Sequence, residues 1–214
     1  MAIVGLRANN LILCERLEIA QFMQVYFKHL QKSGIQLPTI QVFNFQDIGR
    51  LDKFLEKLED AEDFSSVRKV FIFADVGPKL HSKEIEIIRA ENRLNKYDNL
   101  EATYYLFPGL RTTKRWEFGY LEDALEKALY LETSEMANYY NLRNMAEEYL
   151  FSVENNRGKD SKFTNKSLHF LVTYFAGTER FVGMRIAEAA VNNAFDLNHS
   201  VFVPLRERIE KFFL

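Results

Sequence analysis

The sequence predicts an α/β protein with a mostly parallel central sheet and helices on both of its faces. The first observation is the stretch 70–78, VFIFADVGP, in which a short apolar run rich in β-favouring residues ends in one acid and a Gly-Pro pair. This pattern is typical of a buried central strand. The second observation is that such runs alternate with segments of helical periodicity, which indicates parallel strands joined by covering helices.

The N-terminal half supplies the strands of this sheet. They are predicted at residues 11–14, 40–45, 70–73 and 103–107. Between them, apolar residues recur at helical spacing over residues 19–30, 51–58 and 83–95. In the last of these helices, we expect the apolar side chains to face the sheet, namely those of Ile85, Ile87, Ile88 and Leu94.

After about Gly119 the pattern becomes helical. Helices are predicted at residues 121–129, from a cap at Thr133 or Ser134 through Leu150, and at residues 168–175, 184–193 and 205–212. The polar segment 153–163 is predicted to be a loop. Because no linker divides the chain, we expect a single compact domain, with an α/β core at residues 1–118 and a helical region at residues 119–214 packed on that core.

Composition and charge exclude several classes of protein. Hydrophobic residues make up 47% of the chain and charged residues 27%, which is ordinary for a folded globular protein. The formal charge of -2 provides no global field for nucleic acid. The single cysteine, Cys14, lies in an apolar run and is interpreted as a buried packing residue, which fits a reducing cytoplasm. The sequence shows neither a signal peptide nor a stretch long enough to span a membrane.

Two carboxylates follow two of the predicted strands directly. Glu15 ends the run 11–15, and Asp75 ends the run 70–75. Because the carboxyl ends of parallel strands meet at one edge of the sheet, where ligands collect, the pair is a candidate metal or acid/base site. Carboxylate oxygens are typical ligands of Mg²⁺. The alternative is that each acid only caps the helix that follows it.

A second candidate feature is the acidic pair Glu122 and Asp123, which follows the basic segment 111–116, RTTKRW. The acids are also expected in a first helical turn on dipole grounds alone. The basic segment, including Arg115, could hold phosphates, although a solvated loop has the same composition. The four histidines show no zinc-ligand spacing, and neither G-x-x-x-x-G-K-[ST] nor G-x-G-x-x-G occurs in the sequence.

In their order and spacing these features resemble the Toprim-like proteins, in particular a small stand-alone family of uncharacterised function, DUF3226. This family is related to the Toprim domains of overcoming-lysogenization-defect nucleases. Residues 11–15 look like its first motif, a strand ending in Glu, and residues 70–77 look like its Asp-x-Asp strand. Residues 108–123 resemble its segment that ends in Gly-x-Leu-Glu-Asp. The C-terminal likeness rests on residues 166, 174–176, 183–186 and 195–196.

The resemblance implies a Toprim-like fold and a divalent-metal-dependent nuclease or other phosphoryl-transfer protein acting on nucleic acid or a nucleotide phosphate. Mg²⁺ would be the cofactor, with Mn²⁺ as the alternative. Glu15 would act as general acid/base or ligand, and Asp75 as ligand. Glu122 and Asp123 would be supplementary ligands. Either Arg115 or Lys166 would steady the phosphate.

The sequence departs from the family pattern at two acidic positions. The usual first motif, Glu-Gly-x-x-Asp, has Arg16 in place of Gly and Ile19 in place of Asp, and the Asp-x-Asp strand keeps one acid. Loss of carboxylate oxygens weakens a two-metal site, and Arg16 could pair with the remaining acids instead. The alternative hypothesis is therefore an inactive binding or regulatory module. Since the chain lacks a P-loop, any ATPase step would belong to a separate partner.

Overall fold

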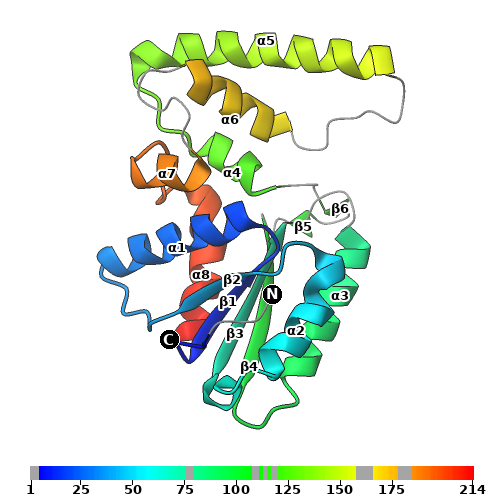
Figure 1. Cartoon of the computed structure of the whole chain (residues 1–214). Helices are drawn as coiled ribbons and strands as arrows, with labels where there is room; N and C mark the ends of the chain where they lie inside the picture. The colour runs from blue at the N-terminus through cyan, green and yellow to red at the C-terminus, as the bar shows by residue number, and fades with distance from the viewer. Residues whose placement is uncertain are drawn as a thin grey trace.

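A computed structural model describes residues 5–75, 80–107, 111–112, 115–116, 120–157, 166–177 and 185–214. The protein has a four-stranded, all-parallel sheet flanked by helices, as the sequence predicts (Figure 1). The strands are β1 (Asn10–Cys14), β2 (Gln41–Asn44), β3 (Lys69–Asp75) and β4 (Glu101–Phe107). Each strand overlaps a run that the sequence predicts, although β1, β3 and β4 begin one or two residues earlier and β3 ends two residues later than predicted.

The strand order is β2-β1-β3-β4, so β3 lies between β1 and β4. The prediction that residues 70–73 form a central strand is therefore confirmed. In the register of the sheet, Cys14 pairs with Phe73, and Asp75 pairs with Phe107. This register brings the carboxyl ends of β1 and β3 side by side. Strand β1 ends directly before Glu15, and β3 ends at Asp75.

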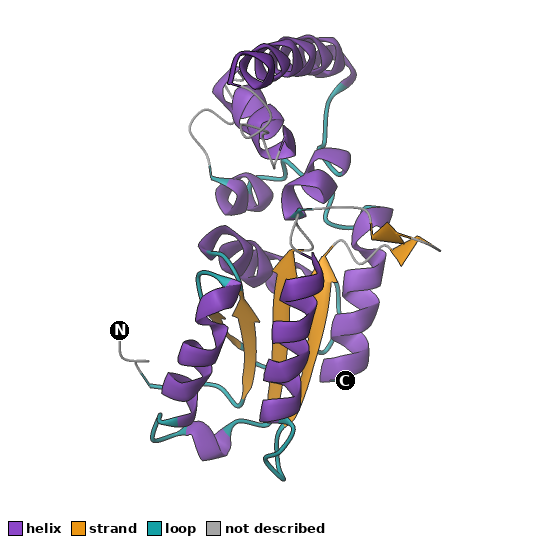
Figure 2. Ribbon diagram, turned by 90° about the vertical axis from the view of Figure 1, so that its right-hand side faces the viewer, coloured by secondary structure: helices purple, strands orange, loops and turns teal. Residues whose placement is uncertain are grey.

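Both faces of β3 are buried, which explains its unbroken apolar sequence. Phe71 and Phe73 belong to one core cluster, whereas Val70 and Ile72 belong to the other. Helices α1 (Leu17–Lys32) and α8 (Val203–Phe213) contribute to the first cluster, and α2 (Leu51–Glu59) and α3 (Leu80–Leu94) contribute to the second. Figure 2 shows the sheet between these helical layers.

The remaining helices lie beyond the carboxyl end of the sheet. They are α4 (Leu121–Lys127), α5 (Thr133–Arg157), α6 (Lys166–Gly177) and α7 (Ile186–Val191). Residues of α4, α6 and α7 belong to the same core cluster as Phe71 and Phe73. Figure 1 places α5 at the end of the molecule farthest from the sheet, with α6 beneath it. The division at residue 118 stays a prediction.

Short 3-10 helices complete the described chain, at Ile48–Arg50, Phe64–Ser66 and Ser200–Phe202. The first begins where the Asp47 carboxylate accepts a hydrogen bond of 2.7 Å from the backbone N–H of Gly49. This contact is the local reason why the chain turns after β2. Helix α1 ends at Lys32, and Gly34, two residues further on, has a φ of 92°, which favours glycine. None of the helices in the described ranges combines the length and the apolar content needed to cross a bilayer.

Two predictions about local structure are wrong. Helix α5 continues to Arg157, so residues 153–157 are helical instead of part of a loop, and residues 158–163 lie outside the described ranges. Ile85 and Ile88 are 37% and 36% exposed, because α3 turns only Ile87, Ala90 and Leu94 fully toward the sheet. The basic segment, for which the sequence predicted no regular element, contains two short antiparallel strands, β5 (Arg111–Thr112) and β6 (Arg115–Trp116).

Candidate functional site at the carboxyl edge of the sheet

The topology creates a switch point at the carboxyl ends of β1 and β3. Strand β1 leads into α1 on one face of the sheet, whereas β3 leads toward α3 on the opposite face. The two connections therefore diverge, and open α/β sheets bind their ligands at such a switch point. Glu15 and Asp75 stand at this point because each directly follows the last apolar residues of its strand.

Glu15 lies on the side of the switch point that faces α3. Its side chain is 9% exposed, and its carboxylate lies 2.8 Å from Nζ of Lys83, a residue in the first turns of α3. The Lys83 ammonium also donates a hydrogen bond of 3.4 Å to the backbone carbonyl of Asp75. Lys83 therefore joins the ends of β1 and β3 through one positive charge.

Arg16 lies between the other two carboxylates. Its guanidinium donates two hydrogen bonds of 2.9 Å to the carboxylate of Glu122, one from each terminal nitrogen. One of these nitrogens also lies 2.5 Å from Oδ2 of Asp75. Both carboxylate side chains are at most 2% exposed. A bidentate Arg–carboxylate pair has a fixed geometry, so Arg16 attaches the start of α4 to the end of β3.

Within the described part of the chain, three buried carboxylates thus face two cations. Burial raises the pKa of the Asp75 carboxyl to about 7, and the neighbouring Glu122 and Glu15 carboxylates also raise it. The Arg16 guanidinium and the hydrogen bond of 2.9 Å from the backbone N–H of Leu121 act in the opposite direction. The cluster holds one negative charge more than its cations neutralise, and this excess adds to the effect of burial on the pKa of Asp75.

We expect the contribution of Asp75 to the free energy of unfolding to decrease as the pH rises. The folded-state pKa of about 7 exceeds the ordinary value of 3.8, so the folded state binds this proton more tightly than the unfolded state. The contribution is fully present below pH 3.8 and is lost as the pH rises through about 7. Urea unfolding at a series of pH values, for wild type and Asp75→Asn, measures it. A difference between the two proteins that does not change with pH would contradict this prediction.

The other predicted site residues have different places. Asp123 accepts a hydrogen bond of 2.6 Å from the backbone N–H of Tyr120, so it caps the start of α4 and does not join Asp75. The backbone of Arg115 lies in β6 and that of Lys166 opens α6, but their side chains are outside the described parts. The expected phosphate contacts of these two residues stay a prediction.

Lys83 is the site residue that the sequence analysis missed. The available signal was its position in the first turns of the helix that follows Asp75, close to the edge where Glu15 was expected. Arg16, in contrast, was considered as a partner for the acids, and the structure places it there. Cys14, which directly precedes Glu15 and Arg16, is buried and forms no disulfide, and burial raises the pKa of its thiol.

The donor set does not fit a divalent metal while Arg16 and Lys83 are in place. Their nitrogens already bind oxygens of all three carboxylates, and Mg²⁺ would need these oxygens as ligands. Accordingly, among the residues that the structure describes, no group of three or more His, Cys, Asp or Glu side chains is arranged to hold a metal ion. The arrangement instead stabilises the junction of β1, β3 and α4.

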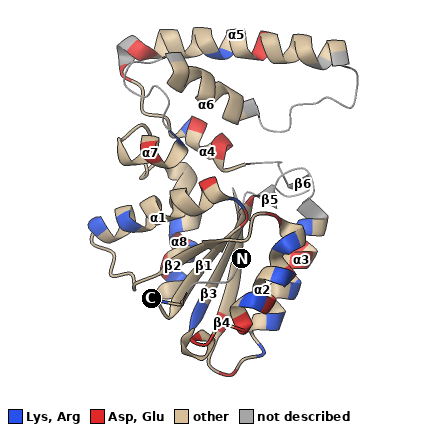
Figure 3. Cartoon of the chain, in the orientation of Figure 1, with Lys and Arg blue, Asp and Glu red and all other residues tan. Residues whose placement is uncertain are grey.

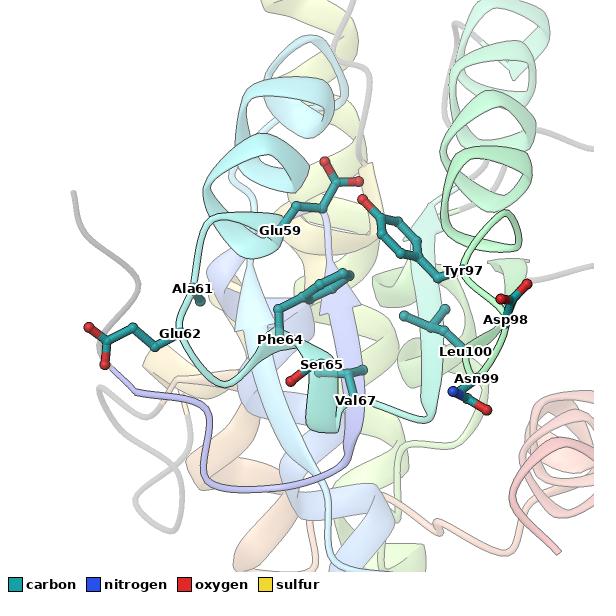
Figure 4. Close-up of a pocket in the computed structure, with 10 residues that line it drawn as sticks. All are labelled: Glu59, Ala61, Glu62, Phe64, Ser65, Val67, Tyr97, Asp98, Asn99 and Leu100. Carbon is teal, nitrogen blue, oxygen red and sulfur yellow. The ribbon is translucent and has the colours of Figure 1, made fainter.

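A separate pocket of about 470 Å³ lies at the opposite, amino end of the sheet. Phe64, Val67 and Leu100 form its apolar floor, and Glu59 and Tyr97 approach each other at its rim (Figure 4). The Glu59 carboxylate is already paired with the guanidinium of Arg93. The pocket and the carboxylate cluster are therefore distinct features at the two ends of the parallel strands.

The fold and the cluster define an α/β protein with a charge-paired acidic centre at the switch point of its sheet. Searches for similar proteins found no matching protein-family model, no matching curated protein and no matching solved structure.

Proposed function

We propose that this protein is a Toprim-like binding or regulatory module in which Arg16 and Lys83 replace the divalent metal of catalytic relatives. The observation that carries the proposal is the Arg16 guanidinium, which lies between Asp75 and Glu122. Arg16 stands at the position where the Toprim-like pattern has Gly, which would leave that space to a metal ion. A guanidinium in this place supplies positive charge without Lewis-acid chemistry.

The ligand of such a module would be a nucleic acid or a nucleotide phosphate. The support for this part is the basic segment that contains β5 and β6, between the end of β4 and the start of α4. Backbone phosphates are held by cationic side chains in a salt-dependent manner. Anisotropy titrations of labelled oligonucleotides at two salt concentrations would test this part separately from the metal.

Metal-dependent phosphodiester hydrolysis is the second candidate function. It is favoured by the convergence of three acids at the ends of β1 and β3 and the start of α4, which are far apart in the sequence. It requires Arg16 to leave the cluster when a metal binds. Metal titrations therefore distinguish the two candidates.

We expect wild type to show no saturable heat of Mg²⁺ or Mn²⁺ binding up to about 10 mM metal. Arg16→Gly frees the oxygens of Asp75 and Glu122, so this variant should bind Mn²⁺ and gain thermal stability from it. The double variant Arg16→Gly with Asp75→Asn is the matched control and should lose that gain. Calorimetric titrations and thermal melts measure both effects.

The opposite result would favour the enzyme. If wild type binds Mg²⁺ and loses this binding in Asp75→Asn, the cations do not replace the metal and the proposal fails. Cleavage of an oligonucleotide by wild type in Mn²⁺, abolished by Glu15→Gln, would lead to the same conclusion.

A further inference from the structure

Helix α5 has a fixed orientation on the protein, and this orientation decides which of its side chains face outward. The carboxylate of Glu126, in α4, accepts hydrogen bonds from the Tyr139 hydroxyl at 2.7 Å and the Ser167 hydroxyl at 2.8 Å. Arg143 approaches the same carboxylate at 2.8 Å and stacks over the ring of Phe170. These contacts tie one side of α5 to α4 and α6, so α5 cannot rotate to hide its other sides.

The sides of α5 that remain carry large apolar residues. Met145 and Tyr149 are 66% and 67% exposed, and Leu142, which is half-buried, lies next to them on the helix. With Asn138, Ser152 and Asn156, these residues recur at alternating spacings of four and three, as do the a and d positions of a coiled coil. We call these six positions the α5 stripe.

The α5 stripe has no charged residue, and Figure 3 shows α5 as mostly uncharged, whereas α2 and α3 carry many charged residues. Glu148 beside it and Glu147 on the opposite side of the helix are exposed, and both would repel nucleic acid or an anionic membrane. A neutral stripe with a helical period fits another neutral helix. The occupant that the sequence of α5 itself matches is a second copy of α5.

We propose that two copies of this chain form a symmetric dimer through antiparallel pairing of their α5 stripes. In the two-fold register that aligns the stripes, Met145 meets Tyr149 of the second copy, a favourable sulfur–aromatic contact. Leu142 meets the small Ser152, and Asn138 meets Asn156 at each end, where an amide pair can fix the register. In this register the exposed Glu148 faces Glu148 of the second copy beside the two-fold axis, where solvent and salt screen the like charges.

The length of α5 is sufficient for such an interface. Its 25 residues correspond to a helix about 37 Å long. Two helices of that length bury roughly 600 Å² on each copy, or about 1,200 Å² in total, which is the lower limit for a specific interface. Figure 1 shows α5 at the outer end of the molecule, where the sheet and its helices do not obstruct a second helix. This inference is independent of the proposed function.

Light scattering after size exclusion, and sedimentation velocity, test the dimer with the full chain at roughly 100 µM, because the dimer fraction rises with chain concentration. We expect wild type to have twice the chain mass of 25.2 kDa. Met145→Lys places two charges in the centre of the pairing and should give a monomer. Tyr149→Gln, which is milder, should raise the dissociation constant at least about tenfold.

Met136→Lys is the matched control, because Met136 is the same residue type on the same helix, 46% exposed, but outside the α5 stripe. It should remain dimeric. Circular dichroism confirms that each variant is folded, as expected for substitutions at exposed positions. A monomeric wild type would overturn the proposal. So would a dimer that survives Met145→Lys and Tyr149→Gln, or one that Met136→Lys disrupts equally.

Discussion

Replacing Phe71 by alanine should lower the free energy of unfolding by about 3–5 kcal/mol. Phe71 is fully buried in the central strand β3, and its ring lies 5.8 Å from that of Phe212 and 6.0 Å from that of Phe213. The substitution removes a large transfer free energy and leaves a cavity between the sheet and α8. Because α8 covers this face of the sheet, the surrounding side chains cannot easily collapse into the gap. Urea unfolding followed by fluorescence or circular dichroism measures the loss.

Phe151→Ala is the matched control for Phe71. It deletes the same side chain from a position on α5 that is 62% exposed and outside the α5 stripe. Its effect should be within about 0.5 kcal/mol. A loss below about 1 kcal/mol for Phe71→Ala would mean that β3 is peripheral to the core, contrary to its position between β1 and β4.

Arg16→Met should be about as destabilising, at roughly 3–5 kcal/mol near neutral pH. The variant keeps much of the aliphatic volume of Arg16 but leaves Asp75 and Glu122 buried without their shared cation. The loss should be smaller at acidic pH, because Asp75 then carries a proton. Thermal and urea unfolding at two pH values test both statements.

Two controls separate charge compensation from packing. Arg89→Met removes an exposed pair with Glu86, whose side chains are 67% and 37% exposed, and should cost less than about 1 kcal/mol. Combining Arg16→Met with Asp75→Asn and Glu122→Gln removes all three of these charges and should recover part of the lost stability. If the combined variant is less stable than Arg16→Met alone, then the buried charges are not the cause.

The sequence was sufficient to predict the sheet, because its signal is local. The apolar run before Asp75 and the shorter run before Glu15 specify strands by β propensity and length. The Gly-Pro pair after Asp75 marks the end of the longer run. Alternation with helices then requires parallel pairing, so both carboxylates fall at one edge. The errors came from interpreting local composition alone. Residues 153–157 are mostly polar, and this composition does not reveal that α5 continues through them.

The same limit applies to adjacent acids and to the faces of helices. Glu122 and Asp123 are neighbours in sequence, but neighbouring side chains on a helix point about 100° apart. Glu122 therefore meets Arg16, whereas Asp123 turns back to cap α4. Likewise, the apolar character of Ile85 and Ile88 does not reveal that only one stripe of α3 contacts the sheet.

The sequence by itself determined that Glu15 and Asp75 stand at the carboxyl edge of a parallel sheet. Only the tertiary structure decided what they meet there. Arg16 is 106 residues away from Glu122, and Lys83 is 68 residues away from Glu15. A strand fixes where its last residue lies, but a long cationic side chain can reach several partners, and the chosen one depends on which helices the fold brings to the edge. In this protein α3 brings Lys83 and α4 brings Glu122, so buried carboxylates are held by side-chain cations.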